Sequence, residues 1–103
     1  MNVSEINQSP IAKQMYRLKF QQYSNILTGN AKEAKKYSKN FAKMAVDNFE
    51  TAVQIPSPIK GQIPLFSKIG FNIIKYMIYN LFTRDSNEEK QLKALLKDYK
   101  YKQ

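Results

Sequence analysis

The sequence predicts an all-α protein, a small four-helix bundle of two helical hairpins with the third helix at its centre. Three observations predict this class. Apolar residues recur at helical spacing in four segments, and no segment shows the alternation of a half-buried strand. A proline-rich connector also divides the chain into two halves. With 103 residues, 43% of them hydrophobic, the chain should form a single helical domain over residues 1–103 with one modest core.

The first helix is expected over about residues 9–28. Ser9 can cap its start, and Pro10 suits the first helical position because a proline has no N–H to leave unsatisfied there. Thr28 and Gly29 should end the helix. Its expected apolar side consists of Ile11, Met15, Leu18, Tyr23, Ile26 and Leu27.

The second helix is expected over about residues 31–54. Asn30 can cap it, and Glu33, three residues later, can return a hydrogen bond in a capping box. Three alanines, Ala34, Ala45 and Ala52, lie on its predicted apolar face. Because alanine side chains are small, they allow a neighbouring helix to approach closely.

The connector is expected over residues 55–63. Residues 55–64 contain three prolines and Gly61. Since proline lacks an N–H and disfavours a helical residue before it, this stretch should be extended.

The third helix is expected over about residues 64–84 and is the most apolar of the four. At roughly 100° per residue, its apolar side chains cover about 220° of the circumference. Lys68, Asn72 and Lys75 form a narrow polar strip that we expect to face water. Lysines inside the segment argue against a membrane span. Such a wide apolar face predicts the centre of the bundle, or alternatively a docking face whose exposed edge comprises Phe71, Ile74, Ile78 and Phe82.

The fourth helix is expected over about residues 87–100. Ser86 and Glu89 have the spacing of a capping box. The stripe facing the core should consist of Leu92, Leu95, Leu96 and Tyr99, which recur at i, i+3, i+4 and i+7.

The composition argues against catalysis. The chain has no histidine and no cysteine, so the commonest general base, the thiolate nucleophile and the soft-metal ligands are all absent. We expect the carboxylates, including the neighbours Glu88 and Glu89, to be solvated surface charges. The three glycines are scattered and form no phosphate-binding loop. We therefore predict no enzyme activity, no catalytic residue, no metal site, no cofactor and no small-molecule substrate.

A row of lysines on the second helix is the clearest candidate binding site. Lys32, Lys36, Lys39 and Lys43 recur at i, i+4, i+7 and i+11 and are flanked by Lys35. Lysines near a helix N-terminus oppose the macrodipole, so the row weakens the isolated helix and suggests an external anion. The alternative is a solvated face enriched in lysine by the codon bias of an A+T-rich genome.

These features predict a small, basic, non-enzymatic binding protein. The formal net charge of +9 suits an anionic lipid surface or an acidic protein partner. One alternative is a nucleic-acid- or ribonucleoprotein-associated protein that binds phosphates through the lysine row. Another is a structural subunit, as a homo-oligomer or in a larger assembly such as a virion. The N-terminus lacks the pattern of a secretory signal, so we expect a cytoplasmic protein, with peripheral attachment to a membrane or another surface as a further expectation.

Overall fold

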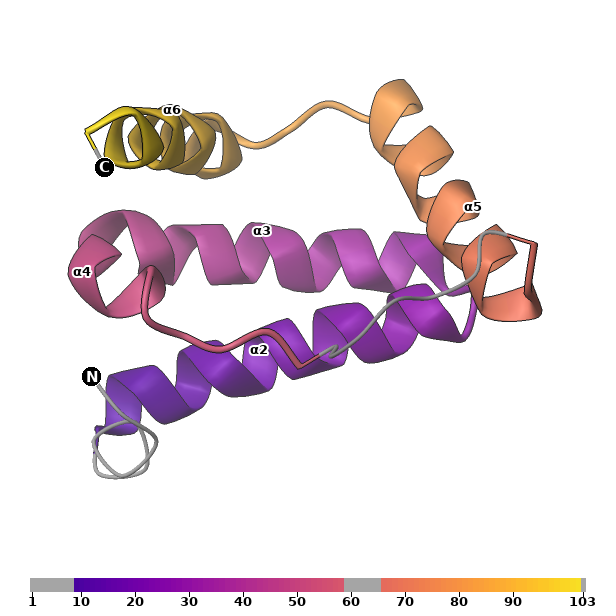
Figure 1. Cartoon of the computed structure of the whole chain (residues 1–103), viewed down its shortest axis with the longest axis horizontal. Helices are drawn as coiled ribbons and strands as arrows, with labels where there is room; N and C mark the ends of the chain where they lie inside the picture. Colours follow the sequence, from indigo (N-terminus) through magenta and orange to yellow (C-terminus); the bar gives the residue numbers. More distant parts are fainter. Residues whose placement is uncertain (1–8, 59–65, 103) are drawn as a thin grey trace.

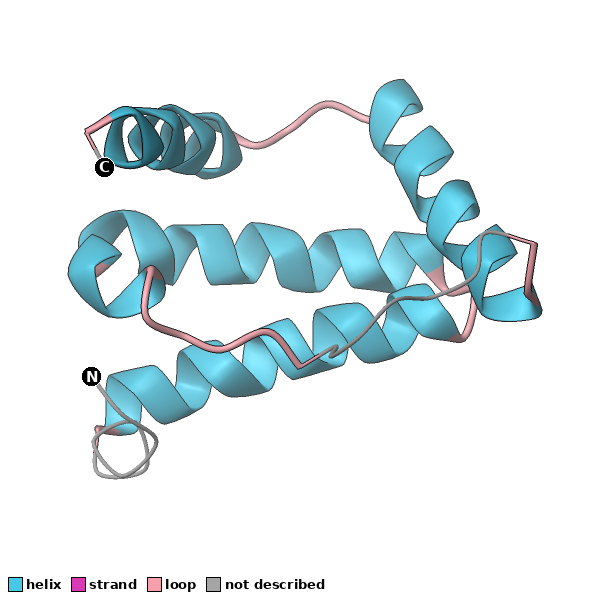
Figure 2. Ribbon diagram, in the orientation of Figure 1, coloured by secondary structure: helices cyan, strands magenta, loops and turns pink. Residues whose placement is uncertain are grey.

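The structure, a computed structural model, describes residues 9–58 and 66–102. These residues form five α-helices and no strand, so the predicted all-α class is confirmed (Figure 2). In chain order the helices are α2 (Pro10–Leu27), α3 (Ala31–Asp47), α4 (Phe49–Ala52), α5 (Lys68–Phe82) and α6 (Asn87–Tyr101).

Helices α2 and α3 form an antiparallel hairpin that makes up the body of the molecule (Figure 1). Ser9 caps α2 as predicted, because its Oγ accepts a hydrogen bond from the N–H of Ala12 at 3.2 Å. Gly29 makes the turn to α3 with φ = +85°, a conformation that costs glycine little.

The predicted capping box at the start of α3 is wrong. The N–H of Asn30 donates to the carbonyl of Asn25 at 2.8 Å, and the N–H of Gly29 donates to that of Ile26 at 3.2 Å. This is the Schellman arrangement that closes a helix C-terminus. The Asn30 side chain makes no cap bond to α3 and donates to the Thr28 hydroxyl instead. The N–H and side chain of Asn30 therefore serve the end of α2, while its carbonyl accepts from the N–H of Ala34 and starts the helical bonds of α3.

The predicted helix over residues 31–54 is interrupted at Asn48. Its Nδ2 donates to the carbonyl of Met44 at 3.0 Å, and its backbone leaves the helical region at φ = −135° and ψ = 50°. An asparagine side chain that bonds a carbonyl four residues back competes with the helical ladder. The chain resumes as the single turn α4, which is set at an angle to α3.

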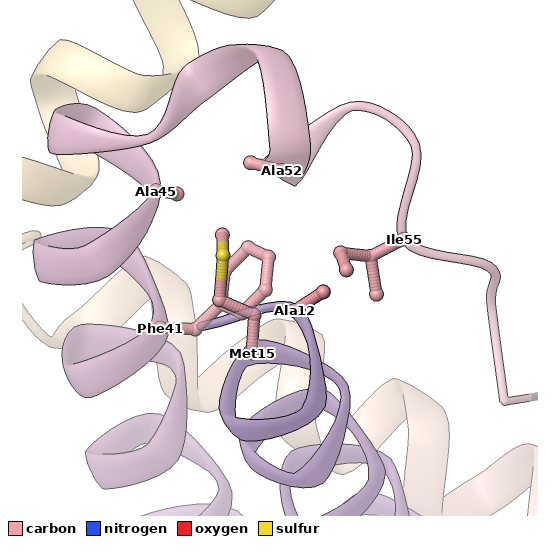
Figure 3. Packing of buried hydrophobic residues seen from close by; sticks show 6 residues of the cluster. All are labelled: Ala12, Met15, Phe41, Ala45, Ala52 and Ile55. Atoms are coloured by element: carbon pink, nitrogen blue, oxygen red, sulfur yellow. The ribbon is translucent and has the colours of Figure 1, made fainter. Parts of the chain in front are cut away.

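The core lies between α2, α3 and α4. Half of its buried cluster consists of alanines, with Met15 beside the ring of Phe41 at its middle (Figure 3). The alanines let α2 and α3 approach closely, as the sequence predicts. The cluster comprises Ala12, Met15, Phe41, Ala45, Ala52 and Ile55.

Helix α6 packs on α3 and not on α5. The predicted capping box is confirmed: Ser86 Oγ accepts from the N–H of Glu89 at 3.2 Å, and Glu89 Oε1 accepts from the N–H of Ser86 at 2.8 Å. Leu92 of the predicted stripe packs against the core cluster. Near the other end of α6, the rings of Phe49 and Tyr99 meet edge to face, with centroids 5.8 Å apart.

The expectation that the third helix lies at the centre is wrong. Helix α3 is central, because α2, α4, α5 and α6 all contact it. Helix α5 crosses one end of the α2–α3 pair (Figure 1), and Gly70 is its only buried residue. It begins at Lys68 rather than near residue 64, since Ser67 Oγ accepts from the N–H of Gly70 at 3.0 Å and caps it there.

The connector is only partly described. Residues 55–58 are not helical, as predicted, and Ile55 contributes to the core cluster. The predicted connector residues 59–63, and residues 64 and 65 of the predicted third helix, lie outside the described residues.

Candidate docking face and basic groove

Helix α5 attaches to the body of the protein through its polar side. Asn72 Nδ2 donates to the carbonyl of Leu27 at 2.7 Å, and Lys75 Nζ donates to the carbonyl of Gly29 at 2.9 Å. A third bond runs from Gln22 Nε2 to the hydroxyl of Tyr76 at 3.2 Å. Asn72 and Lys75, from the strip that the sequence predicts to face water, therefore hold α5 in place, while Lys68 and Lys75 remain exposed.

The end of α2 explains this orientation. The last carbonyls of a helix have no partner within the helix, and the negative end of its macrodipole favours a cation. Asn72 and Lys75 supply two donors and one positive charge at this position. Gly29 also gives α5 room, since a Cβ there would lie 3.1 Å from Asn72 Oδ1.

One polar atom on the inward side of α5 lacks a hydrogen-bond partner among the described residues. Asn80 Oδ1 is buried and has no hydrogen-bond partner in the described part of the chain. A buried polar atom without a partner costs about 1–3 kcal/mol. The same helix thus buries an unpaired amide oxygen while most of its large apolar side chains remain in water.

The apolar side of α5 faces outward. Leu81 is 83% exposed and Phe82 86% exposed, and Phe66, just before the helix, is 92% exposed. At roughly 100° per residue, the outward residues cover an arc of about 140°. We call this the apolar face; it comprises Phe71, Ile74, Met77, Ile78, Leu81 and Phe82.

All four residues of the predicted docking edge lie on the apolar face. Phe71, Ile78 and Phe82 are exposed, and Ile74 is partly exposed. The exposed face is broader than this predicted edge, because Met77 and Leu81 are exposed as well. The structure thus leaves uncovered a surface that the predicted bundle would have buried.

A groove with a volume of about 680 Å³ lies between α3, the C-terminal part of α5 and the start of α6. Four lysines of the predicted row, Lys32, Lys36, Lys39 and Lys43, line it. None of these four forms an ion pair with another described residue. We call this hollow the basic groove. Its other lining residues among those that the structure describes are Lys35, Asn40, Tyr79, Ser86 and Asn87, with the exposed Glu33 and the partly buried Glu88 as its carboxylates.

Lys35, the fifth predicted anion-binding residue, is not free to bind an external anion. It is 4% exposed, and its Nζ lies 2.7 Å from Asp85 Oδ1 and 3.1 Å from Glu89 Oε2. Ser38 also donates to Glu89 at 2.9 Å, and Lys93 contacts Asp85 from the surface. We call Lys35, Asp85 and Glu89 the buried ion cluster; it joins α3 to the α5–α6 loop and the first turn of α6.

The buried ion cluster also corrects the expectation that Glu89 is a solvated charge, since Glu89 is 6% exposed. Burial acts to raise its pKa, but hydrogen bonds from the Ser86 N–H, Lys35 and Ser38 outweigh this, so the net pKa is lowered. Hydrogen bonds from Lys35 and Lys93 lower the pKa of Asp85. Burial opposes the charge on Lys35, yet its two carboxylate partners raise its pKa overall. All three groups are therefore held in their charged forms.

Two other groups have pKa values displaced chiefly by burial. Burial lowers the pKa of Lys19, whose Nζ lies 5.3 Å from the centroid of the Phe41 ring. Burial raises the pKa of Tyr23, while a hydrogen bond with Ser57 acts in the opposite direction. Neither group lines the basic groove.

Sequence reasoning missed three features of this region. Asn72 and Lys75 hold α5 to α2, and Tyr79 lines the basic groove. The third is the buried ion cluster, whose members are 50 and 54 residues apart along the chain. The only local signal was the capping-box spacing of Ser86 and Glu89, which predicts one hydrogen bond of Glu89 but not its burial.

In comparisons with known proteins, no family model, no curated protein and no solved structure matches this chain. Among the described residues, no group of three or more acidic side chains is placed to hold a metal ion. No helix in the same residues has the length and apolar character needed to cross a membrane.

Proposed function

We propose that this is a non-enzymatic binding protein that attaches to an anionic lipid surface through the apolar face of α5. One observation carries the proposal: α5 docks on the body through its polar side and presents its apolar side to solvent. An exposed apolar patch of this kind marks an interaction surface. An amphipathic helix lying in the plane of a membrane uses the same arrangement.

The charges around the apolar face favour an anionic lipid surface as the occupant. Residues 66–84 contain Lys68, Lys75 and Arg84 and no acidic residue. Each basic residue near an anionic membrane contributes about 1 kcal/mol, in addition to apolar insertion. A second copy of the chain would instead bring the same cations into one interface. The aromatic rings and aliphatic chains of the face would lie at the level of the acyl chains, with the exposed Lys68 and Arg84 at the headgroups, since Lys75 is bonded to the Gly29 carbonyl.

The test is flotation with vesicles of phosphatidylcholine alone and of equal parts phosphatidylcholine and phosphatidylglycerol. The variant Leu81→Ser/Phe82→Ser removes the two most exposed large apolar side chains of α5. Burial of each such side chain is worth about 1.5–3 kcal/mol, so we expect binding to fall at least tenfold. The matched control is Ile11→Ser/Phe20→Ser, which removes two exposed apolar side chains from α2, 44% and 51% exposed.

The expected result is that the wild type floats with the anionic vesicles, the α2 control floats equally well and the α5 variant does not. Equal losses in both variants, or flotation of the α5 variant at the wild-type level, would overturn the proposal. The remaining alternative is that the apolar face joins two copies of the chain, and sedimentation equilibrium tests it. A micromolar dimer that dissociates only in the α5 variant would identify the apolar face as a subunit interface instead.

A further inference from the structure

The basic groove is a second surface with a different chemistry. Besides the paired Lys35, four lysines line it along α3, and the separation of eleven residues between Lys32 and Lys43 corresponds to a row about 16 Å long. The nearby carboxylates Asp85 and Glu89 are already engaged by Lys35, so they do not neutralise the row. Four cations therefore remain available along this side of α3, and they outnumber the two other carboxylates that line the groove, Glu33 and Glu88.

The lining of the basic groove restricts the kind of ligand. Among the residues that the structure describes, no aliphatic side chain lines it, and Tyr79 is its one aromatic residue. An amphipathic peptide helix needs an apolar groove, which this surface does not offer. A lone phosphate would meet one or two lysines and leave the rest of the row unused. The fitting ligand is an extended polyanion with a hydrophilic backbone.

We infer that the basic groove binds single-stranded nucleic acid, with the lysines on successive phosphates and Tyr79 stacking on a base. A cationic groove that follows the backbone, combined with an aromatic side chain, is the arrangement of sequence-tolerant single-strand binding. Lysine acts on phosphate as a point charge and lacks the planar fork with which arginine reads guanine. The binding is therefore independent of sequence and strongly dependent on salt.

The experiment measures the fluorescence anisotropy of a labelled oligothymidylate as a function of salt. For single strands, the slope of the logarithm of the binding constant against the logarithm of the salt concentration is about −0.7 per phosphate contacted. Four lysines on four phosphates therefore give a slope of about −3. Affinity should then fall about fiftyfold between 50 and 200 mM salt. The variant Lys32→Gln/Lys36→Gln/Lys39→Gln/Lys43→Gln should bind far more weakly, with a nearly flat salt dependence. Its fold should persist, because glutamine is a good helix former and the changes relieve the opposition to the macrodipole.

The matched control separates the effect of the groove lysines on binding from the effect of the protein's net charge. Lys13→Gln/Lys90→Gln/Lys97→Gln/Lys100→Gln also removes four lysines and lowers the formal net charge from +9 to +5. All four lie outside the groove, so the control should keep most of the affinity and slope. An equal loss in both variants would show a non-specific charge effect and overturn the inference. Unchanged binding by the groove variant would also overturn it.

Two competitors and two substitutions of Tyr79 complete the test. Equal displacement by polyglutamate would identify an acidic polypeptide as the ligand, and tighter binding to duplex DNA would exclude a single-strand site. Tyr79→Phe should bind like the wild type, because it keeps the ring. Tyr79→Leu should weaken binding about tenfold, and wild-type affinity in this variant would remove the stacking role.

Nucleic-acid binding by the basic groove does not depend on lipid attachment through the apolar face. The four groove lysines lie on α3, whereas the apolar face lies on α5. Flotation of the groove variant and oligothymidylate binding by Leu81→Ser/Phe82→Ser therefore test the two surfaces separately, and either proposal can fail without the other.

Discussion

Replacing Lys35 by methionine should be among the most destabilising single substitutions in this protein. The side chains of Lys35 and Glu89 are 5% and 7% exposed, so Lys35→Met leaves a buried carboxylate without its cation. Breaking a buried ion pair on one side costs about 3–5 kcal/mol. We expect the lower end, about 3 kcal/mol, because Asp85 keeps Lys93 and Glu89 keeps its bonds to Ser38 and Ser86. For a domain of this size, that loss lowers Tm by about 12–24 °C.

A second substitution, Glu89→Gln, measures how much of this loss comes from the uncompensated negative charge of Glu89. Glu89→Gln removes the negative charge but keeps an oxygen that can accept from the Ser86 N–H, so the capping box can persist. In the background of Lys35→Met, it should recover at least 1 kcal/mol of the loss, since the uncompensated charge disappears. The assay is urea unfolding followed by circular dichroism at pH 7, with m-values compared across the cycle. A Lys35→Met variant within about 0.5 kcal/mol of wild type, or strictly additive effects, would refute the burial argument.

Three further predictions follow from the same contacts. Gly29→Ala should cost about 1–2 kcal/mol, because the φ is positive and the new methyl would crowd Asn72; wild-type urea stability would contradict this. Ser86→Ala should lower the free energy of unfolding by about 1 kcal/mol, whereas Asn30→Ala should change it by less than about half of that, since its side chain makes no cap bond to α3; equal thermal shifts would contradict this contrast. The carboxylates of the buried ion cluster have lowered pKa values, so their contribution is present above their unfolded pKa, about 4, and disappears as the pH falls through the folded values. The raised pKa of Lys35 makes its contribution present below its unfolded value of about 10.4 and lost as the pH rises through the folded value. Denaturant unfolding should thus show stability falling below about pH 4, less steeply in Lys35→Met, and an equal acid-side fall in both proteins would count against the assignment.

The orientation of α5 is the most consequential feature of this fold. Burying its apolar side would satisfy the hydrophobic effect, but the carbonyls at the end of α2 would then lose Asn72 and Lys75. The polar docking mode leaves a large apolar surface in water, together with a buried Asn80 oxygen that has no partner. Such a conflict between local and global preferences is expected where a surface serves binding rather than stability.

The sequence alone determined the helical segments and most of their ends. Ser9, Gly29 and Ser86 act through bonds within a few residues, so local pattern was sufficient to locate them. The alanines of α3 likewise predicted close packing with a neighbouring helix. The lysine row of α3 followed from its spacing, and all five of its members line one groove, where Lys35 is buried and paired with Asp85 and Glu89.

Only the tertiary structure decided which side of each helix is buried. Periodicity shows that α5 has a polar strip and an apolar arc, but not that the polar strip meets the end of α2. Lys35 has the same local spacing signal as its neighbours, yet carboxylates 50 and 54 residues away turn it inward. Asn30 and Glu33 have capping-box spacing, yet the N–H of Asn30 donates to the carbonyl of Asn25 at the end of α2. In each case a partner distant along the chain, or a neighbouring turn, competed successfully for a polar group, and a local sequence pattern carries no information about that competition.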